Sequence, residues 1–312
     1  MRKVEARHLF RFSDLIGDRH LAAISTIPEP ELSVVILSSK EKPYGWVRNT
    51  EDGLQKAKLG WTYHYQVHHW TRRDCSTLNL VETGRDFDYV ERLGVGEWLL
   101  AGSRIIPQQK RNAVVFNDKG RQIDSLFFSD AVRSIQATSE GNFIWVSYFD
   151  EGVFSEYDLS SEGLVCFNRN GEPVYRYHTQ LRENNCFALD QISDCYALNV
   201  PNDQDVWVYY YPSFPLVKIQ NGTIRKVWHD LGIAGSKLFA VTEERALFGR
   251  GYHEEGLYLV TLSQERCPGE KIRSVDYQGN DIPITQRSFA RGARLYLPRG
   301  DDLFVLELDY DL

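Results

Sequence analysis

Acidic and aromatic side chains follow two apolar stretches of the sequence. Asp150 and Glu151 come directly after the apolar stretch 143–149, and Tyr252, His253 and Glu254 come after a second one. Carboxylates that converge from several strands can bind a hard divalent cation through oxygen ligands, or act as a general acid and base. Acids before a glycine are also common in solvated turns, so the turn interpretation stays open beside the chemical one.

Motifs that would assign a catalytic reaction are missing from the sequence. It contains no Gly-x-Ser-x-Gly, His-Glu-x-x-His, phosphate loop or dinucleotide glycine fingerprint. The five cysteines are odd in number and form no Cys-x-x-Cys pair, which indicates free, mostly buried thiols. A protein without catalytic activity and without a cofactor is the leading hypothesis, and an enzyme remains the alternative.

Charge and hydropathy narrow the class of protein. The 312 residues carry a formal charge of −7 with both signs interleaved, which argues against a nucleic-acid partner. The first residues lack the apolar core of a signal peptide, and the strongest apolar run, 32–37, is too short to span a membrane. We expect a cytoplasmic monomer with neither a membrane nor a nucleic-acid partner.

The stretch 141–178 carries the clearest fold signal. Aromatic and β-branched residues alternate on both sets of positions in 143–149, which predicts a strand buried on both faces. Two further strands, 164–167 and 174–177, are joined by Asn168 to Gly171, whose Asn-Gly supplies the positive φ of a tight hairpin. With 132–138 upstream, these strands form a four-stranded antiparallel meander of the size of one propeller blade.

Similar units recur along the chain. They predict an all-β fold, a six-bladed β-propeller of four-stranded antiparallel blades, as a single domain over 1–312. The expected blades are 21–82, 87–128, 132–178, 195–228, 237–276 and 287–308. The last of these has only three strands, so 3–12 is expected to supply its outer strand and close the ring, with a flexible N-terminal arm as the alternative. The segments 40–59 and 181–194 have no assignment.

Alternate turns of a meander lie on opposite faces, so the loops between second and third strands gather on one rim of the ring. We expect this rim and the axial pocket to bind a protein or a small molecule. The candidate ligand-binding residues are Tyr148, Asp150, Glu151, Tyr211, Arg250, Tyr252, His253, Glu254 and Asp301.

A family resemblance rests on two neighbouring motifs. The strand Trp-Val-Ser-Tyr-Phe-Asp-Glu-Gly at 145–152 and Gly-Leu-Val-Cys-Phe-Asn-x-x-Gly at 163–171 resemble repeats of bacterial six-bladed propellers of the broad NHL, SMP-30 and TolB-like group. The resemblance covers roughly 87–280. SMP-30-like lactonases bind a divalent metal at the ring axis, so it implies, as the alternative function, a metal-dependent hydrolase or lactonase. A cation such as Ca²⁺ or Mn²⁺ would then be held by Asp150, Glu151 and Glu254, although the family's ligands have no residue-by-residue match here.

Overall fold

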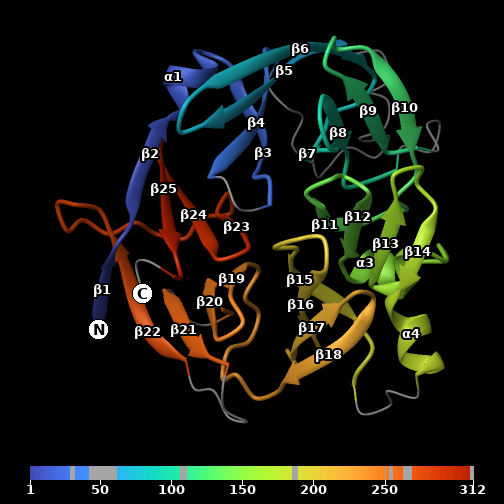
Figure 1. Cartoon of the computed structure of the whole chain (residues 1–312), viewed down its shortest axis with the longest axis vertical. Helices are drawn as coiled ribbons and strands as arrows, with labels where there is room; N and C mark the ends of the chain where they lie inside the picture. Colours follow the sequence, from blue (N-terminus) through green and yellow to red (C-terminus); the bar gives the residue numbers. More distant parts are fainter. Residues whose placement is uncertain are drawn as a thin grey trace, which may run out of the picture.

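Six β-sheets stand around a common axis in the computed structural model of the chain (Figure 1). The structure describes residues 1–28, 32–41, 62–105, 111–184, 189–249, 251–252, 256–262 and 269–309. Each sheet contains a meander of consecutive antiparallel strands, and the first strand of each meander lies nearest the axis. The prediction of a six-bladed β-propeller with antiparallel blades is confirmed.

Four blades use four consecutive strands each, and the last two recruit the N-terminus. Blade one is β3 (His20–Ser25), β4 (Ser33–Ser39), β5 (Thr62–Thr71) and β6 (Cys75–Thr83), and blade two is β7 (Tyr89–Arg92), β8 (Glu97–Ala101), β9 (Ala113–Asn117) and β10 (Gln122–Leu126). Blade three is β11 (Val132–Ala137), β12 (Phe143–Tyr148), β13 (Leu164–Asn168) and β14 (Pro173–Arg176), and blade four is β15 (Asp194–Asn199), β16 (Asp205–Tyr211), β17 (Leu216–Gln220) and β18 (Thr223–Trp228). Blade five contains β19 (Phe239–Val241), β20 (Arg245–Gly249), β21 (Leu257–Thr261) and β22 (Glu270–Val275), and blade six contains β23 (Phe289–Arg291), β24 (Arg294–Arg299) and β25 (Asp302–Glu307).

The N-terminal segment closes the ring, as predicted, but the expectation of one strand over 3–12 is wrong. Strand β1 (Arg2–Glu5) pairs in parallel with β22 of blade five, and β2 (Arg7–Arg11) pairs antiparallel with β25 of blade six. The chain crosses between the blades at Ala6, whose N–H donates to the carbonyl of Val275 at 2.8 Å. The N-terminal segment therefore adds one strand to the edge of β22 and another to the edge of β25, and so joins the two blades.

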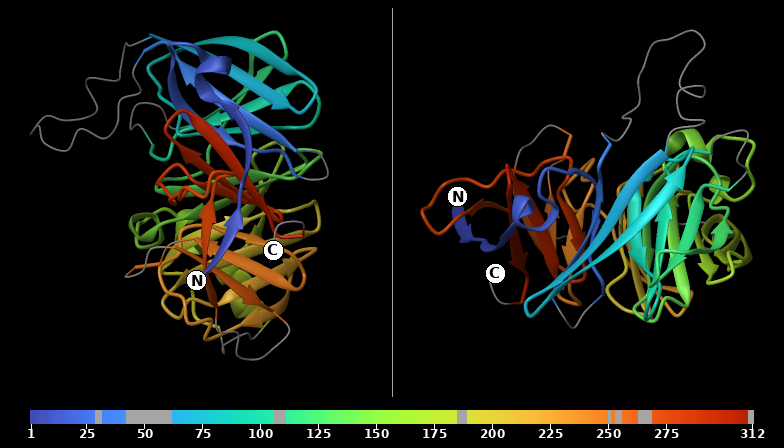
Figure 2. Two further views of the ribbon diagram at one scale, coloured as in Figure 1. Left: turned by 90° about the vertical axis from the view of Figure 1, so that its left-hand side faces the viewer. Right: turned by 90° about the horizontal axis from the view of Figure 1, so that it is seen from above.

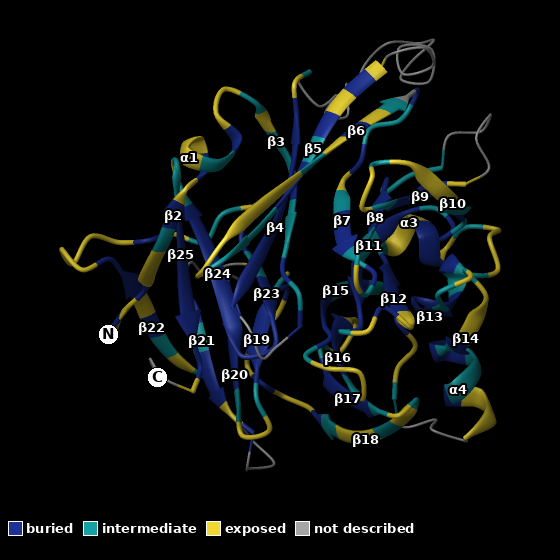
Figure 3. Cartoon of the chain, turned by 45° about the horizontal axis from the view of Figure 1, so that its top comes forward, coloured by how far each residue is buried: buried dark blue, intermediate teal, exposed yellow. Residues whose placement is uncertain are grey.

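The hydrophobic core is divided among the spaces between blades. In the described residues it forms six clusters, and each cluster contains side chains of two adjacent blades. On β4, Val34 and Ile36 face blade six while Val35 and Leu37 face blade two. The alternation with a period of two therefore buries both faces of a middle strand, and Figure 3 shows these strands as buried while outer strands such as β14 and β18 carry exposed residues.

Turns and short helices complete the ring. Gly171, expected to need positive φ, has a φ of 80°, and the hairpin glycines Gly120 and Gly222 of the neighbouring blades have φ of 71° each. The helices α1 (Phe12–Ile16), α3 (Asp150–Val153) and α4 (Tyr177–Glu183) and the 3-10 turn η1 (Ser160–Glu162) lie in connections. Within the described ranges, none of the helices has the length and apolar character needed to cross a membrane. The long hairpin of β5 and β6, cyan in Figure 2, runs along the outside of the molecule.

Candidate functional site

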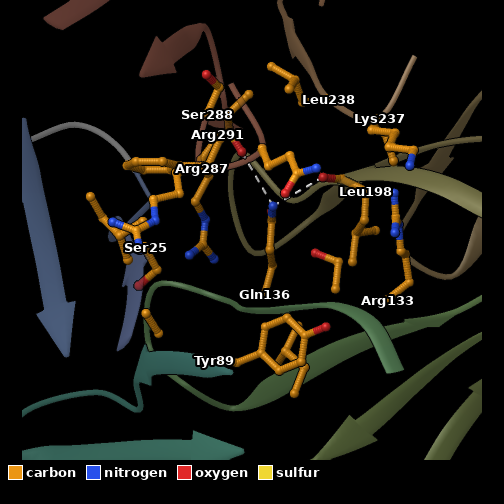
Figure 4. A pocket seen from close by; sticks show the side chains of 18 of the residues that line it. Ser25, Tyr89, Arg133, Gln136, Leu198, Lys237, Leu238, Arg287, Ser288 and Arg291 are labelled. Atoms are coloured by element: carbon orange, nitrogen blue, oxygen red, sulfur yellow. Dashed lines mark hydrogen bonds between the residues drawn. The ribbon is translucent and has the colours of Figure 1, made fainter. Parts of the chain in front are cut away.

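The six innermost strands surround a cavity of about 780 Å³ on the axis of the ring (Figure 4). It is lined from β3, β7, β11, β15, β19 and β23 and the residues next to them. These six strands are equivalent and run in one direction, so their first residues surround one end of the axis, the mouth, and their last residues surround the other, the floor. The loops between second and third strands lie on the mouth side. A volume of this size suits a small organic ligand.

Arg291 is the central side chain of the floor. From blade six, its Nη1 donates to Glu91 Oε2 of blade two at 2.9 Å and to the carbonyl of Thr26 of blade one at 2.6 Å. Its Nε donates to the carbonyl of Val200 of blade four at 3.1 Å, and its Nη2 donates to the carbonyl of Ala137 of blade three. Burial raises the pKa of Glu91, although Arg291 and the Ala137 N–H oppose the shift.

Two buried amides complete this floor. Gln136 of blade three donates to the carbonyl of Leu198 at 3.0 Å and accepts from the Val200 N–H at 2.7 Å. Asn199 of blade four donates to the carbonyl of Phe239 of blade five at 2.8 Å and accepts from the Gly292 N–H of blade six at 2.7 Å. Together with Arg291 and Glu91, these amides hydrogen-bond all six blades to one another at the axis. We call this set of four residues the axial hub.

Basic side chains gather at the mouth. Arg133 lies near the start of β11, while Lys237 and Arg287 lie just before β19 and β23, and all three line the cavity. No hydrogen bond or salt bridge joins their side chains to the rest of the described chain. In Figure 4, Arg133 and Lys237 extend from one side of the cavity and Arg287 from the other.

Two acids accompany these bases. Asp88 lines the cavity and accepts a hydrogen bond from the Ser103 N–H at 2.7 Å. Asp194, at the start of β15, has its pKa raised by burial, while the nearby charges of Arg133 and Lys237 oppose the shift and Asp150 adds to it.

An aromatic pair forms another part of the lining. Tyr196 and Tyr252 share a hydrogen bond between their hydroxyls, and their rings are nearly perpendicular with centroids 5.6 Å apart. Phe214 contacts both rings, with centroids 5.2 and 5.7 Å away. Burial, followed by the hydrogen bond shared with Tyr252, raises the pKa of Tyr196.

Tyr252 is held in place by the connection between blades four and five. Its N–H donates to the carbonyl of Ala234 at 2.9 Å. Its ring lies directly over Gly235, where a Cβ atom would come within 2.6 Å of the ring carbons. The conformation of this connection therefore sets the position of the tyrosine at the mouth.

The predicted rim residues are only partly brought together. Tyr252 lines the cavity, and Tyr211 is exposed with its ring edge against Phe214. Asp150 and Glu151 are exposed at the start of α3 and do not line the cavity, and Glu151 pairs with Arg104. The predicted residues Arg250, His253 and Glu254 fall outside the described part of the chain.

Two predicted rim residues have structural roles instead. Tyr148 is fully buried between blades two and three, and its hydroxyl donates to the carbonyl of Phe128 at 2.7 Å, so it does not reach the rim. Asp301 accepts hydrogen bonds from the Ser13 N–H at 2.9 Å and from Arg11 Nε at 3.1 Å, so it holds the N-terminal segment against blade six. Both faces of β12 are buried, and its alternate residues pack toward blade two and toward blade four. Tyr148 belongs to the set that packs toward blade two.

Metal-ligating groups are not assembled in the described residues. No group of three or more His, Cys, Asp or Glu side chains is arranged there to hold a metal ion. Of the three acids proposed for a cation, Glu151 is paired with Arg104, Asp150 lies outside the cavity, and Glu254 is outside the described ranges.

The sequence does contain a signal for the basic residues at the mouth, which the sequence analysis did not predict because it considered mainly acidic residues. Arg133, Lys237 and Arg287 stand at the first or second position of the innermost strands expected for blades three, five and six. Comparing equivalent positions of the repeat would have found them. Glu91 and Arg291 have no such signal, because they are 200 residues apart and meet only when the ring closes.

The closed ring of six sheets defines the class of protein, a six-bladed β-propeller, and it encloses an axial cavity. In sequence, the profile of the YxzG family matches residues 164–305, from the third strand of blade three to the last strand of blade six. No curated protein matches the chain.

Among solved structures, the chain is similar to Hsv2 from Kluyveromyces lactis, with a TM-score of 0.52, 8% identity, and coverage of 93% of this chain and 75% of that one. It is also similar to the β-propeller domain of Cps50 (Swd1) from Myceliophteria thermophila, with a TM-score of 0.48, 10% identity, and coverage of 96% and 98%. A gluconolactonase from Xanthomonas campestris has a TM-score of 0.41, 12% identity, and coverage of 97% and 94%. At these identities the similarity concerns the fold alone.

Proposed function

We propose that this protein is a binding propeller whose axial cavity takes up a small molecule through the mouth. The observation that carries the proposal is the cavity of about 780 Å³, which has polar and aromatic side chains at its mouth and a hydrogen-bonded floor. Ligand sites in proteins are concave, largely pre-formed and oriented by a few polar groups.

The axial hub supports this proposal because it fixes the walls before a ligand arrives. Arg291, Gln136 and Asn199 are all buried and bridge between blades, so the innermost strands are held in one arrangement. A pre-organised site loses less conformational entropy when a ligand binds.

A second candidate function, the binding of a protein on the same face, is favoured by exposed aromatic side chains. Phe154 is 75% exposed and Tyr157 is 40% exposed in the loop between β12 and β13, and Tyr211 is 46% exposed in the next blade. Aromatic residues are enriched at the cores of protein interfaces. A partner protein could therefore dock around the mouth.

The test of small-molecule binding compares a blocked cavity with an intact one. Ser134 lines the cavity on β11, so Ser134→Trp fills part of it, while Ser76→Trp adds the same bulk to the exposed face of β6. A library of several hundred metabolites is screened by thermal shift and ligand-observed NMR. We expect compounds that stabilise the wild type and Ser76→Trp, but not Ser134→Trp, by up to ~3 kcal/mol at 100 times Kd. Equal binding to Ser134→Trp would contradict the proposal.

A further inference from the structure

We infer that the axial cavity selects organic anions, molecules that carry a carboxylate or phosphate group together with an apolar ring. Arg133, Lys237 and Arg287 bind the anionic group, and the ring packs beside Tyr196 and Tyr252. This inference rests on the proposed function and adds the chemical class of the ligand.

The charge of the cavity lining differs in sign from that of the whole chain. The protein has a formal charge of −7, but the lining contains four cations, Arg133, Lys237, Arg287 and Arg291, and two acids, Asp88 and Glu91. The pair of Arg291 and Glu91 is neutralised within the floor. The positive excess therefore lies at the mouth, where it attracts an anion and raises its local concentration.

The basic side chains at the mouth are available to a ligand. Arg133, Lys237 and Arg287 come from three different blades and make no side-chain hydrogen bond or salt bridge with the described residues. Guanidinium and ammonium groups recognise carboxylates and phosphates by charge-assisted hydrogen bonds.

The acids near Arg133, Lys237 and Arg287 do not compensate all of the positive charge of these three side chains. Asp194 lies in the field of both Arg133 and Lys237, so one carboxylate serves two cations, and Asp150 lies near Asp194. Asp88 is engaged by the Ser103 N–H. We therefore expect a ligand's anionic group to lie toward Arg133, Lys237 and Arg287 and away from Asp150.

The aromatic pair explains why the ligand also needs an apolar part. Tyr252 is 50% exposed at the mouth, and it is held by its hydrogen bond to Tyr196 and by the contact of its ring with Gly235. A rigid, half-exposed aromatic ring beside a set of cations offers apolar surface to the body of an organic anion at little cost in conformational entropy.

The experiment uses matched pairs of anions and neutral analogues. About forty pairs are screened by thermal shift and titrated by calorimetry at pH 7.5 and low salt, including phenyl phosphate with phenol and benzoate with benzamide. Inorganic phosphate separates the anionic group from the ring. The variants are Arg133→Gln and Arg287→Gln, with Arg225→Gln on the exposed face of β18 as the control.

We expect the anionic members to bind wild type and Arg225→Gln at least tenfold more tightly than their neutral partners, with affinity falling as salt is added. Arg133→Gln and Arg287→Gln should each weaken this binding about tenfold or more. Preference for phosphates or for carboxylates then identifies the anionic group, and weaker binding of inorganic phosphate supports the role of the ring.

Other outcomes overturn the inference and leave the proposed function distinguishable. If only neutral or cationic compounds bind, and Ser134→Trp abolishes that binding, the cavity is a ligand site but not for anions. Anion binding that is unchanged in both arginine variants also overturns the inference. If no compound of either collection binds, the inference and the proposed function both fail.

Discussion

Gly235 provides the space in which the Tyr252 ring lies. Gly235 has φ of +79°, and an added Cβ would meet the ring at 2.6 Å. We expect Gly235→Ala to lower the free energy of unfolding by more than the ~1–2 kcal/mol of a left-handed alanine alone. Urea unfolding measures the loss.

A matched control lies three residues away in the same connection. Gly232 has φ of +69° but nothing within 4 Å of an added Cβ, so Gly232→Ala reports the backbone strain without the clash. Because Tyr252→Ala removes the obstructing ring, we expect the double variant of Gly235→Ala and Tyr252→Ala to lose less stability than the two single losses combined. Additive losses would show that the ring contact has no energetic role.

His68 on β5 makes stability depend on pH. Burial, and then the charge of Arg19, lower the pKa of His68 to about 4, and its ring contacts the hydroxyls of Ser38 at 3.0 Å and Thr77 at 3.2 Å. As pH falls, His68 of the unfolded chain takes up a proton near pH 6.5, whereas His68 of the folded protein takes it up only near pH 4. The stabilising preference for neutral His68 is therefore complete above pH 6.5 and is lost as pH falls from 6.5 to 4.

Urea unfolding at pH 7.5, 6 and 5 checks this prediction. The wild type should lose about 1–2 kcal/mol more than His68→Gln between pH 7.5 and 5. Other titrating groups affect both proteins, so the difference between the two isolates His68. Parallel pH profiles would rule out its contribution.

On strand β12, two residues of the same face differ sharply in their burial. Trp145 is 6% exposed in the cluster between blades three and four, whereas Phe143 on the same strand is 41% exposed. We expect Trp145→Ala to cost about 3–5 kcal/mol and Phe143→Ala less than ~1 kcal/mol. Thermal and urea unfolding test both, and similar losses would contradict the burial of Trp145 between blades three and four.

Closure of the ring depends on the first eleven residues. They supply β1 and β2 and bury Val4, Ala6 and Phe10, so deleting residues 1–11 exposes the edges of β22 and β25. We expect a loss of at least ~3 kcal/mol, or failure to fold. Deleting residues 1–5 alone keeps β2 and should cost less. Wild-type thermal stability after the longer deletion would show that closure does not need this segment.

Arg291 joins the blades at the axis of the ring, whereas the N-terminal segment joins two blades at their outer edges. Arg291→Met removes its bonds to blades one, two, three and four and leaves Glu91 buried without its cation. The expected loss in calorimetric or urea unfolding is about 3–5 kcal/mol. The double variant with Glu91→Met removes the uncompensated charge and should recover part of it, whereas no recovery would mean that the bonds to carbonyls alone account for the loss.

Much of this architecture was predictable because its signals are local. The alternation in 143–149 and the hairpin glycine at 171 each depend on a few neighbouring residues, and the recurrence of similar units specifies the other blades. The three-stranded last unit also predicted that the N-terminus would complete it. The division of the N-terminal segment at Ala6 was not predictable, because it depends on which sheet edges are free. The helix α4 was not predictable either, because it depends on the path that the chain takes from blade three to blade four.

Of the nine rim residues predicted from the sequence, the cavity lining contains Tyr252, and the other lining residues were not predicted. From the sequence, acids after strand β12 looked convergent, and only the closed ring shows Glu151 paired with Arg104 while Arg133, Lys237 and Arg287 face the axis. Sequence by itself determined the strands, their turns and the repeat, since these follow from short-range alternation and backbone conformation. Tertiary structure alone decided the axial hub, because its residues are tens to hundreds of positions apart and meet only when six blades close around one axis.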